Sequence, residues 1–148
     1  MSLVGNKIQA LKEFDPKRII LDFIAENSKD IAAYVSDMQL FIEGIRGEDG
    51  EFIADYWPYR PFTVAVKQTK GQPTDRVTLR DTGAFHASIQ VTTDSEKFTV
   101  TATDPKTEEL QQKYGEGILN LSDENLHSLK VALLIPELRK KFKEAIFA

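Results

Sequence analysis

Apolar side chains between residues 16 and 46 recur at helical spacing, which predicts a long N-terminal helix. Asp15 and Pro16 suit its start, because an aspartate caps free N–H groups and a proline has no N–H to leave unpaired. Gly44 and Gly47 suit its end. The positions of this stripe lie three or four residues apart, as on one face of a helix: Ile20, Ile24, Asn27, Ile31, Tyr34, Met38, Phe41 and Ile45.

The polar run at residues 27–30 leaves two alternatives open for this segment. It suits the cap of a second helix, so residues 16–46 form either one continuous helix or two helices joined at a kink. The stripe also has two interpretations. It covers the sheet of its own domain, or it meets a helix of another subunit, where the polar Asn27 would fix the register.

An acidic, glycine-bearing connector follows at residues 47–51. Between residues 43 and 55, five acids stand against the single base Arg46, a net charge of −4 that equals the charge of the whole chain. The ligand spacing of an EF-hand is absent, so a solvated loop is expected rather than a calcium site.

Aromatic residues and prolines are concentrated at residues 56–62, which include the only tryptophan, Trp57. Two prolines close together argue against a helix here. The rings either anchor a loop in the core or form an interface, where Trp, Tyr and Arg contribute most of the binding energy. The alternation of Phe62, Val64 and Val66 with polar or small residues predicts a short strand, with a loop as the alternative.

A polar stretch at residues 67–80 has a basic tilt and contains Gly71 and Pro73. We expect a long exposed loop, and loops of this length tend to be mobile or functional. In an acidic chain, such a loop would meet an acidic protein surface or DNA.

The clearest β-hairpin lies at residues 89–92 and 98–103. Each segment alternates apolar residues with polar ones, mostly threonine, and residues 94–96 form the turn.

The C-terminal third is predicted to be helical. A short helix is expected at residues 107–114, and Ser122 caps another with the apolar face Leu126, Leu129 and Leu133. Pro136 kinks or restarts that helix. The basic face beyond it is expected to be solvated: Arg139, Lys140, Lys141 and Lys143.

Composition narrows the functional classes. The length of 148 residues fits a single domain, with the expected parts 1–15 (N-terminal segment), 16–46 (long helix), 47–80 (loop-rich linker) and 81–148 (sheet and C-terminal helices). The chain has no cysteine, which excludes a thiolate zinc site or a cysteine nucleophile. The net charge of −4 argues against general DNA or membrane binding, and no apolar run is long enough to span a bilayer.

Motifs for nucleotide binding, zinc hydrolysis or a serine nucleophile elbow are absent. His86 and His127 each lack a second ligand at metal spacing, so both are interpreted as structural residues. Asp81, His86 and Ser88 are close in sequence, but a catalytic triad is defined by geometry, so hydrolase chemistry is a minor alternative. We therefore expect no catalytic residue, cofactor or metal.

A series of ordered motifs resembles the neck and tail-completion proteins of long-tailed bacteriophages, namely the Mu-type virion morphogenesis and lambdoid head–tail joining families. The series runs from a Trp-Pro loop through a basic linker to a Thr-Gly segment that enters an antiparallel sheet, and ends in a Pro-led helix. It comprises Trp57-Pro58, Thr63, Lys67, Lys70, Leu79, Thr82-Gly83, Ala84, Phe85, Ser88-Ile89, Val91, Phe98–Thr103, Tyr114-Gly115 and Pro136-Glu137-Leu138.

This resemblance implies a non-catalytic structural protein of a virion or prophage. It would complete the tail or join head to tail as a ring, in these families usually of six copies, with other neck or tail proteins as partners. It would reside in the virion and, during assembly, in the host bacterial cytoplasm. A ring needs two different complementary faces on each subunit. The residues expected to contact subunits or partners are Tyr56, Trp57, Tyr59, Arg60, Lys67, Lys70, Arg76 and Arg80.

Two other functions are kept as alternatives: a small accessory module that binds a partner peptide or subunit, and a small hydrolase. The expected fold class is α+β, with a long N-terminal helix, a small antiparallel sheet and C-terminal helices packed on one face. Membrane and sequence-specific nucleic-acid partners are not expected.

Overall fold

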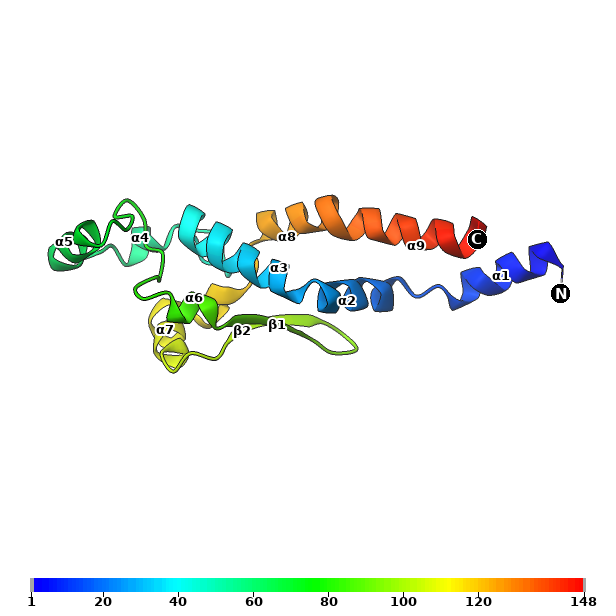
Figure 1. Cartoon of the computed structure of the whole chain (residues 1–148), viewed down its shortest axis with the longest axis horizontal. Coiled ribbons are helices and arrows are strands. Elements are labelled where there is room, and N and C mark those ends of the chain that lie inside the picture. Colours follow the sequence, from blue (N-terminus) through cyan, green and yellow to red (C-terminus); the bar gives the residue numbers. More distant parts are fainter. Residues whose placement is uncertain (1, 148) are drawn as a thin grey trace.

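The chain forms an elongated molecule in which helices run along the long axis (Figure 1). The computed structural model describes residues 2–147. A β-hairpin, the helices α2 (Pro16–Glu26) and α3 (Ser28–Ala33), and the helix α8 (Asp123–Leu129) lie along one another in the middle of the molecule. The last helix, α9 (Ile135–Phe147), runs from there past α2 to the end where α1 lies. The α+β class is confirmed, and none of the helices within residues 2–147 is both long and apolar enough to cross a bilayer.

The first two helices start at side-chain caps. Helix α1 spans Leu3–Glu13, and the hydroxyl of Ser2 accepts a hydrogen bond from the Gly5 N–H at 3.0 Å. Helix α2 spans Pro16–Glu26, and the Asp15 carboxylate accepts from the Arg18 N–H at 3.2 Å. The predicted start at Asp15 and Pro16 is therefore confirmed, but the N-terminal segment before it is itself helical.

The single long helix predicted at residues 16–46 is not confirmed. Helix α2 ends at Asn27, whose backbone leaves the helical region (φ −111°, ψ 22°), and α3 (Ser28–Ala33) continues into a π-helix, η1 (Tyr34–Glu43). Asn27 donates its side-chain amide to the Phe23 carbonyl at 2.8 Å. This bond satisfies a carbonyl at the end of α2, so the polar stripe position marks a break in the helix.

The π-helix also moves the buried face away from the predicted stripe. Each π turn contains one residue more than an α turn, so the face that points inward shifts along the sequence. Val35, Gln39 and Leu40 are fully buried, whereas Met38, a predicted stripe position, is exposed. The predicted stripe is therefore confirmed at Ile24, Ile31 and Ile45, which are buried, and wrong at Met38.

Two predictions for the linker at residues 47–80 are wrong. It contains the helices α4 (Ile53–Tyr56) and α5 (Pro61–Thr69), and α5 covers the strand predicted at residues 62–66. Proline does not prevent this helix, because Pro61 occupies its first turn, where no N–H is needed.

The stretch from residue 67 to 80 is also not the exposed loop that was expected. Residues 70–80 have no regular structure, but Lys67, Val77 and Thr78 are buried, the last two to 1% exposure. Segment 47–51 does form a solvated loop as predicted, since residues 48–51 are exposed.

The predicted hairpin is confirmed. Strand β1 (Ile89–Thr93) pairs antiparallel with β2 (Phe98–Ala102), with Val91 opposite Val100, and both of these valines are buried. The Asp94 carboxylate accepts from the N–H groups of Glu96 and Lys97 in the turn, and these bonds lower the pKa of Asp94. A one-turn helix, α6 (Ala84–Ala87), precedes the hairpin.

Four short elements and a long helix complete the described chain. Helix α7 (Thr107–Tyr114) ends at Gly115 as predicted and leads into the 3-10 helix η2 (Glu116–Leu119). Helix α8 (Asp123–Leu129) begins at the Ser122 cap and continues through a π segment, η3 (Lys130–Leu134), into α9 (Ile135–Phe147).

Pro136 does not end the C-terminal helix. The π segment ends two residues before this proline, which has no N–H to offer the preceding turn. The extra residue in the π turn again shifts the inward face, so Leu134 is buried and the predicted Leu133 is exposed.

A buried polar network joins η1 to the start of α8. The Gln39 amide is fully buried; its Oε1 accepts from the Ser122 N–H at 3.0 Å and from Asn125 Nδ2 at 3.1 Å, and its Nε2 donates to the Asn120 carbonyl at 2.8 Å. Asn125 also donates to Glu43 at 2.8 Å. These bonds hold the end of η1, and therefore the acidic loop that follows, against the C-terminal half.

Candidate interaction surfaces

The predicted aromatic cluster is organised around an arginine from the acidic loop. The Arg46 guanidinium lies over the rings of Tyr56 and Trp57, with 4.5 and 5.3 Å to their centres. Trp57 also meets Tyr114 edge to face at 5.4 Å. The same guanidinium pairs with Asp49, which lowers the pKa of that carboxyl. The cluster thus anchors the acidic loop to α4 and to the end of α7.

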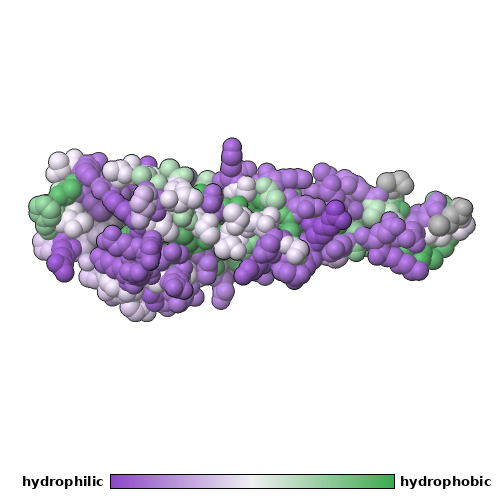
Figure 2. Space-filling model, turned by 90° about the horizontal axis from the view of Figure 1, so that it is seen from below, coloured by the Kyte–Doolittle hydropathy of each residue, from purple (hydrophilic) through white to green (hydrophobic). Residues whose placement is uncertain are grey.

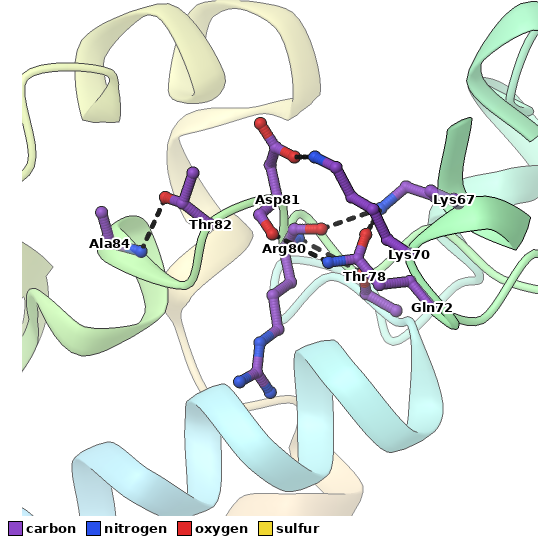
Figure 3. A network of polar contacts seen from close by, with 8 residues as sticks. All are labelled: Lys67, Lys70, Gln72, Thr78, Arg80, Asp81, Thr82 and Ala84. Carbon is purple, nitrogen blue, oxygen red and sulfur yellow. Dashed lines mark hydrogen bonds and ion pairs between the residues drawn. The ribbon is translucent and has the colours of Figure 1, made fainter.

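The predicted basic segment is held by a network of polar contacts (Figure 3). Lys67 is buried and donates to the Arg80 carbonyl at 2.8 Å and to Gln72 Oε1 at 3.3 Å, while its ammonium group lies 4.9 Å from the centre of the Tyr59 ring. The Tyr59 hydroxyl accepts from the Thr78 N–H at 3.0 Å. Residues 67–80 are therefore tied to α5 at both ends.

The remaining predicted cations of this segment also contact their own chain. Lys70 pairs with Asp81 at 2.5 Å, which lowers the pKa of Asp81. Arg76 donates to the Phe41 carbonyl at 2.7 Å. Arg80 extends its side chain away from the network towards η1 (Figure 3), where its guanidinium lies 5.1 Å from the centre of the Phe41 ring.

The structure therefore places most of the predicted contact residues in intramolecular contacts. Trp57, Tyr59 and Lys67 pack inside the fold, whereas Tyr56 and Arg60 keep exposed surface. The role of the eight residues in binding a partner stays a prediction, and Arg46, which organises the aromatic cluster, was not among them.

His86 and Ser88, which the hydrolase alternative would place in a catalytic site, form hydrogen bonds with backbone groups instead. His86 is buried, and its Nε2 lies 2.8 Å from the Thr78 carbonyl, so Nε2 carries the proton and donates. The Ser88 hydroxyl donates to the Phe85 carbonyl at 2.8 Å and accepts from the Asp104 N–H at 3.0 Å. Within residues 2–147, no hydrogen bond joins His86 to Ser88 or Asp81, so this geometry lends no support to a triad.

Acidification is expected to destabilise the fold through His86. Burial lowers the pKa of His86 below its ordinary value of 6.5, and its buried Nδ1 has no partner that could receive a second N–H. The unfolded chain takes up a proton near pH 6.5 while the folded chain does not. The free energy of unfolding therefore falls as the pH drops below about 6.5, by ~1.4 kcal/mol for each unit of pKa difference.

Urea unfolding between neutral pH and about pH 5 measures this effect, because carboxylates lose their contribution mainly at lower pH. His86→Gln is the matched variant, since its amide can still donate to Thr78 but does not titrate. We expect the slope to disappear in this variant. An unchanged slope would show that another group is responsible.

A cavity of about 400 Å³ lies beside the basic segment. Its apolar wall includes Leu79, Phe85 and Leu110, and charged groups of both signs line its rim, among them Lys106 and Asp104. Leu79 adopts a left-handed backbone conformation (φ 58°), which is strained for a residue with a side chain. The Lys67 ammonium, which also lines this cavity, already donates to two oxygen partners.

Exposed apolar side chains gather at the end of the molecule that carries both termini. In α1, a stripe points away from any core, and α1 and α9 together contain no buried residue. The two helices lie against each other, and the ring of Phe14, directly after α1, meets that of Phe142 on α9 edge to face at 5.4 Å. The exposed apolar residues of this terminal arm, formed by α1 and α9, are Leu3, Val4, Ile8, Leu11, Ile135, Phe142 and Phe147.

The opposite end of the molecule also exposes apolar side chains. Figure 1 places α4 and α5 at this end, and Figure 2 shows apolar surface at its tip. Phe62, in the first turn of α5, is 80% exposed, and Phe52 and Tyr56 flank the acidic loop with more than half of their surface exposed.

Sequence reasoning predicted the C-terminal helix of the terminal arm but missed α1. The signal was present, because Ser2 is a good N-cap and Val4, Ile8 and Leu11 lie at spacings of four and three.

An apolar groove of about 620 Å³ separates α2 from the junction of η3 and α9. Ile20, Ile24, Leu134 and Leu138 line it, and Lys17 and Glu96 form an ion pair across its rim. The groove lies between the two ends, beside the hairpin tip.

The chain matches no protein-family model, and neither a curated protein nor a solved structure is similar enough to count as a match.

Proposed function

We propose that this chain is a structural protein that assembles with copies of itself, and that it completes the tail or joins head to tail in a phage-type virion. The observation that supports assembly is the exposure of apolar side chains at both ends of an elongated molecule. Phe62 is 80% exposed at one end, and Leu3 and Phe147 are 72% and 74% exposed at the other. Two separate exposed apolar surfaces on one subunit suit a heterologous contact, in which one surface binds the other surface of the next subunit. Repetition of such a contact produces a closed ring or an open filament.

The virion part of the proposal comes from the order of the sequence motifs. The segment that carries the Thr82-Gly83 motif does enter a small antiparallel hairpin through α6. The proposal of neck or tail proteins as partners is supported by the sequence resemblance.

Sedimentation velocity from micromolar to near-millimolar concentration, with electron microscopy of the largest species, tests this function. We expect species larger than a dimer whose fraction rises with concentration, and closed rings in the images. A protein that stays monomeric over the whole range would contradict self-assembly.

Replacement of the most exposed aromatic residue should separate assembly from folding. Phe62→Ser removes apolar surface at the α5 end without touching the core, so we expect the free energy of unfolding to change by less than about 0.5 kcal/mol while association weakens about tenfold or more, as for an interface anchor. Val131→Ser is the matched control, because Val131 is 53% exposed on η3, away from both ends. Equal effects of the two variants on association would remove Phe62 from the interface.

A further inference from the structure

The terminal arm and the acidic segment at residues 43–55 carry opposite charge. The terminal arm has six basic residues against three acidic ones, a net charge of +3. The acidic segment, which precedes α5 and its basic residues, has five acids against one base, a net charge of −4. The chain as a whole carries −4, so this separation is not visible in the composition.

Most of these charges are free to meet another molecule. Lys12, Arg139, Lys140 and Lys143 are exposed, and within residues 2–147 none of them forms an ion pair. In the acidic segment, Asp49 forms an ion pair with Arg46, and the Glu43 carboxylate accepts a hydrogen bond from the Asn125 side chain. Glu48, Glu51 and Asp55 are exposed, and the ion pairs of the described chain do not include them.

Apolar and charged groups are interleaved at both ends. Phe52 and Tyr56 each follow an exposed acid, Glu51 and Asp55, and both aromatic side chains are more than half exposed. On α9, Phe142 stands between Lys141 and Lys143. An interface with an apolar centre and a charged rim needs this combination on both of its faces.

We infer that the terminal arm of one copy binds the acidic end of the next copy, with α1 and α9 against residues 48–56. This inference rests on the proposed self-assembly and specifies its contact. The occupant is a second copy of the chain, because the same molecule presents both the basic and the acidic face, each with exposed apolar groups. Such a contact is head to tail, so every subunit in a ring uses both faces.

Charge reversal tests the contact. In the arm variant, Lys140→Glu and Lys143→Glu change the net charge of the arm from +3 to −1. In the acidic-end variant, Glu51→Lys and Asp55→Lys change the net charge of residues 43–55 from −4 to 0. Each variant removes the charge attraction between the two faces, so we expect its association to weaken about tenfold or more at low salt. An equimolar mixture of the two variants should associate again, because each supplies the face that the other needs.

A double variant on α2 and α3 provides the matched control. Glu26→Lys with Asp30→Lys reverses two exposed acids between the two ends, one of them in the first turn of a helix, as Asp55 is. We expect its association to remain within about threefold of the unaltered chain, because neither position lies on the contact. Circular dichroism and urea unfolding verify that every variant folds.

The outcomes separate this contact from the proposed function. Loss of association in both variants, recovery in their mixture and no effect of the control would support the head-to-tail contact. If the unaltered chain assembles and the reversals have no effect, or if the mixture fails to recover, the contact is wrong while self-assembly stands. If the unaltered chain does not assemble at all, both proposals fail.

Discussion

Gly47→Ala is expected to lower the free energy of unfolding by about 3 kcal/mol or more, because the backbone of η2 and its following turn lies against this glycine. A Cβ atom at Gly47 would stand 1.3 Å from the Asn120 carbonyl oxygen. The obstacle is backbone and cannot rotate away, so the acidic loop must move as a whole. The Gly47 N–H also donates to the Ile118 carbonyl at 3.4 Å, a bond that this movement would break.

Gly71→Ala is the matched control for this substitution. Gly71 has a left-handed backbone (φ 68°), but no atom lies within 4 Å of the position of an added Cβ. Its cost should therefore be limited to backbone strain, about 1–2 kcal/mol. Urea denaturation of both variants measures the difference. If both lose the same free energy, the close approach of Gly47 to Asn120 is not a constraint on the fold.

Gln39→Leu is expected to cost about 3 kcal/mol although it nearly preserves the volume of the side chain. Leucine would leave the buried Ser122 N–H and Asn120 carbonyl without their partner, and an unsatisfied buried group costs about 1–3 kcal/mol. Asn125 would keep its bond to Glu43, which limits the loss. The variant should also loosen the acidic loop, because Gln39 and Glu43 connect η1 to α8.

Thermal and urea unfolding measure this effect, with Gln112→Leu as the control. Gln112 is exposed on α7, and its amide makes only a 3.5 Å contact with Glu108. Its replacement should change the free energy of unfolding by less than about 0.5 kcal/mol. A small effect of Gln39→Leu, comparable to that of Gln112→Leu, would mean that water satisfies the groups that Gln39 contacts.

The local pattern of the sequence determined the helix starts and the hairpin, because these features depend on residues that are neighbours in the sequence. Asp15 and Ser122 cap helices as predicted, since a cap needs only its own side chain and the next turn. The hairpin followed from alternation and the Asp94 turn. Asn27, a polar interruption in an apolar stripe, did mark the break between two helices.

Long-range contacts decided what the pattern could not. The π segments η1 and η3 shift the inward face by one residue, and only packing shows that Val35, Gln39 and Leu134 are buried in place of Tyr34, Met38 and Leu133. Gly47 was interpreted as a helix stop. Glycine is needed there because the backbone of Asn120, more than seventy residues later, leaves no room for a Cβ atom. Lys67 was expected on a loop, but the Arg80 carbonyl and the Tyr59 ring hold it inside the fold.

The same distinction applies to the candidate surfaces. The acidic segment and the basic C-terminal face were visible in the sequence, because charge is a property of each residue alone. Their separation to opposite ends of an elongated molecule, each beside exposed apolar side chains, depends on how α1 lies against α9 and how the chain turns at Gly44. Spacing along the chain carries no information about such distances, since they are set by contacts between residues far apart in sequence.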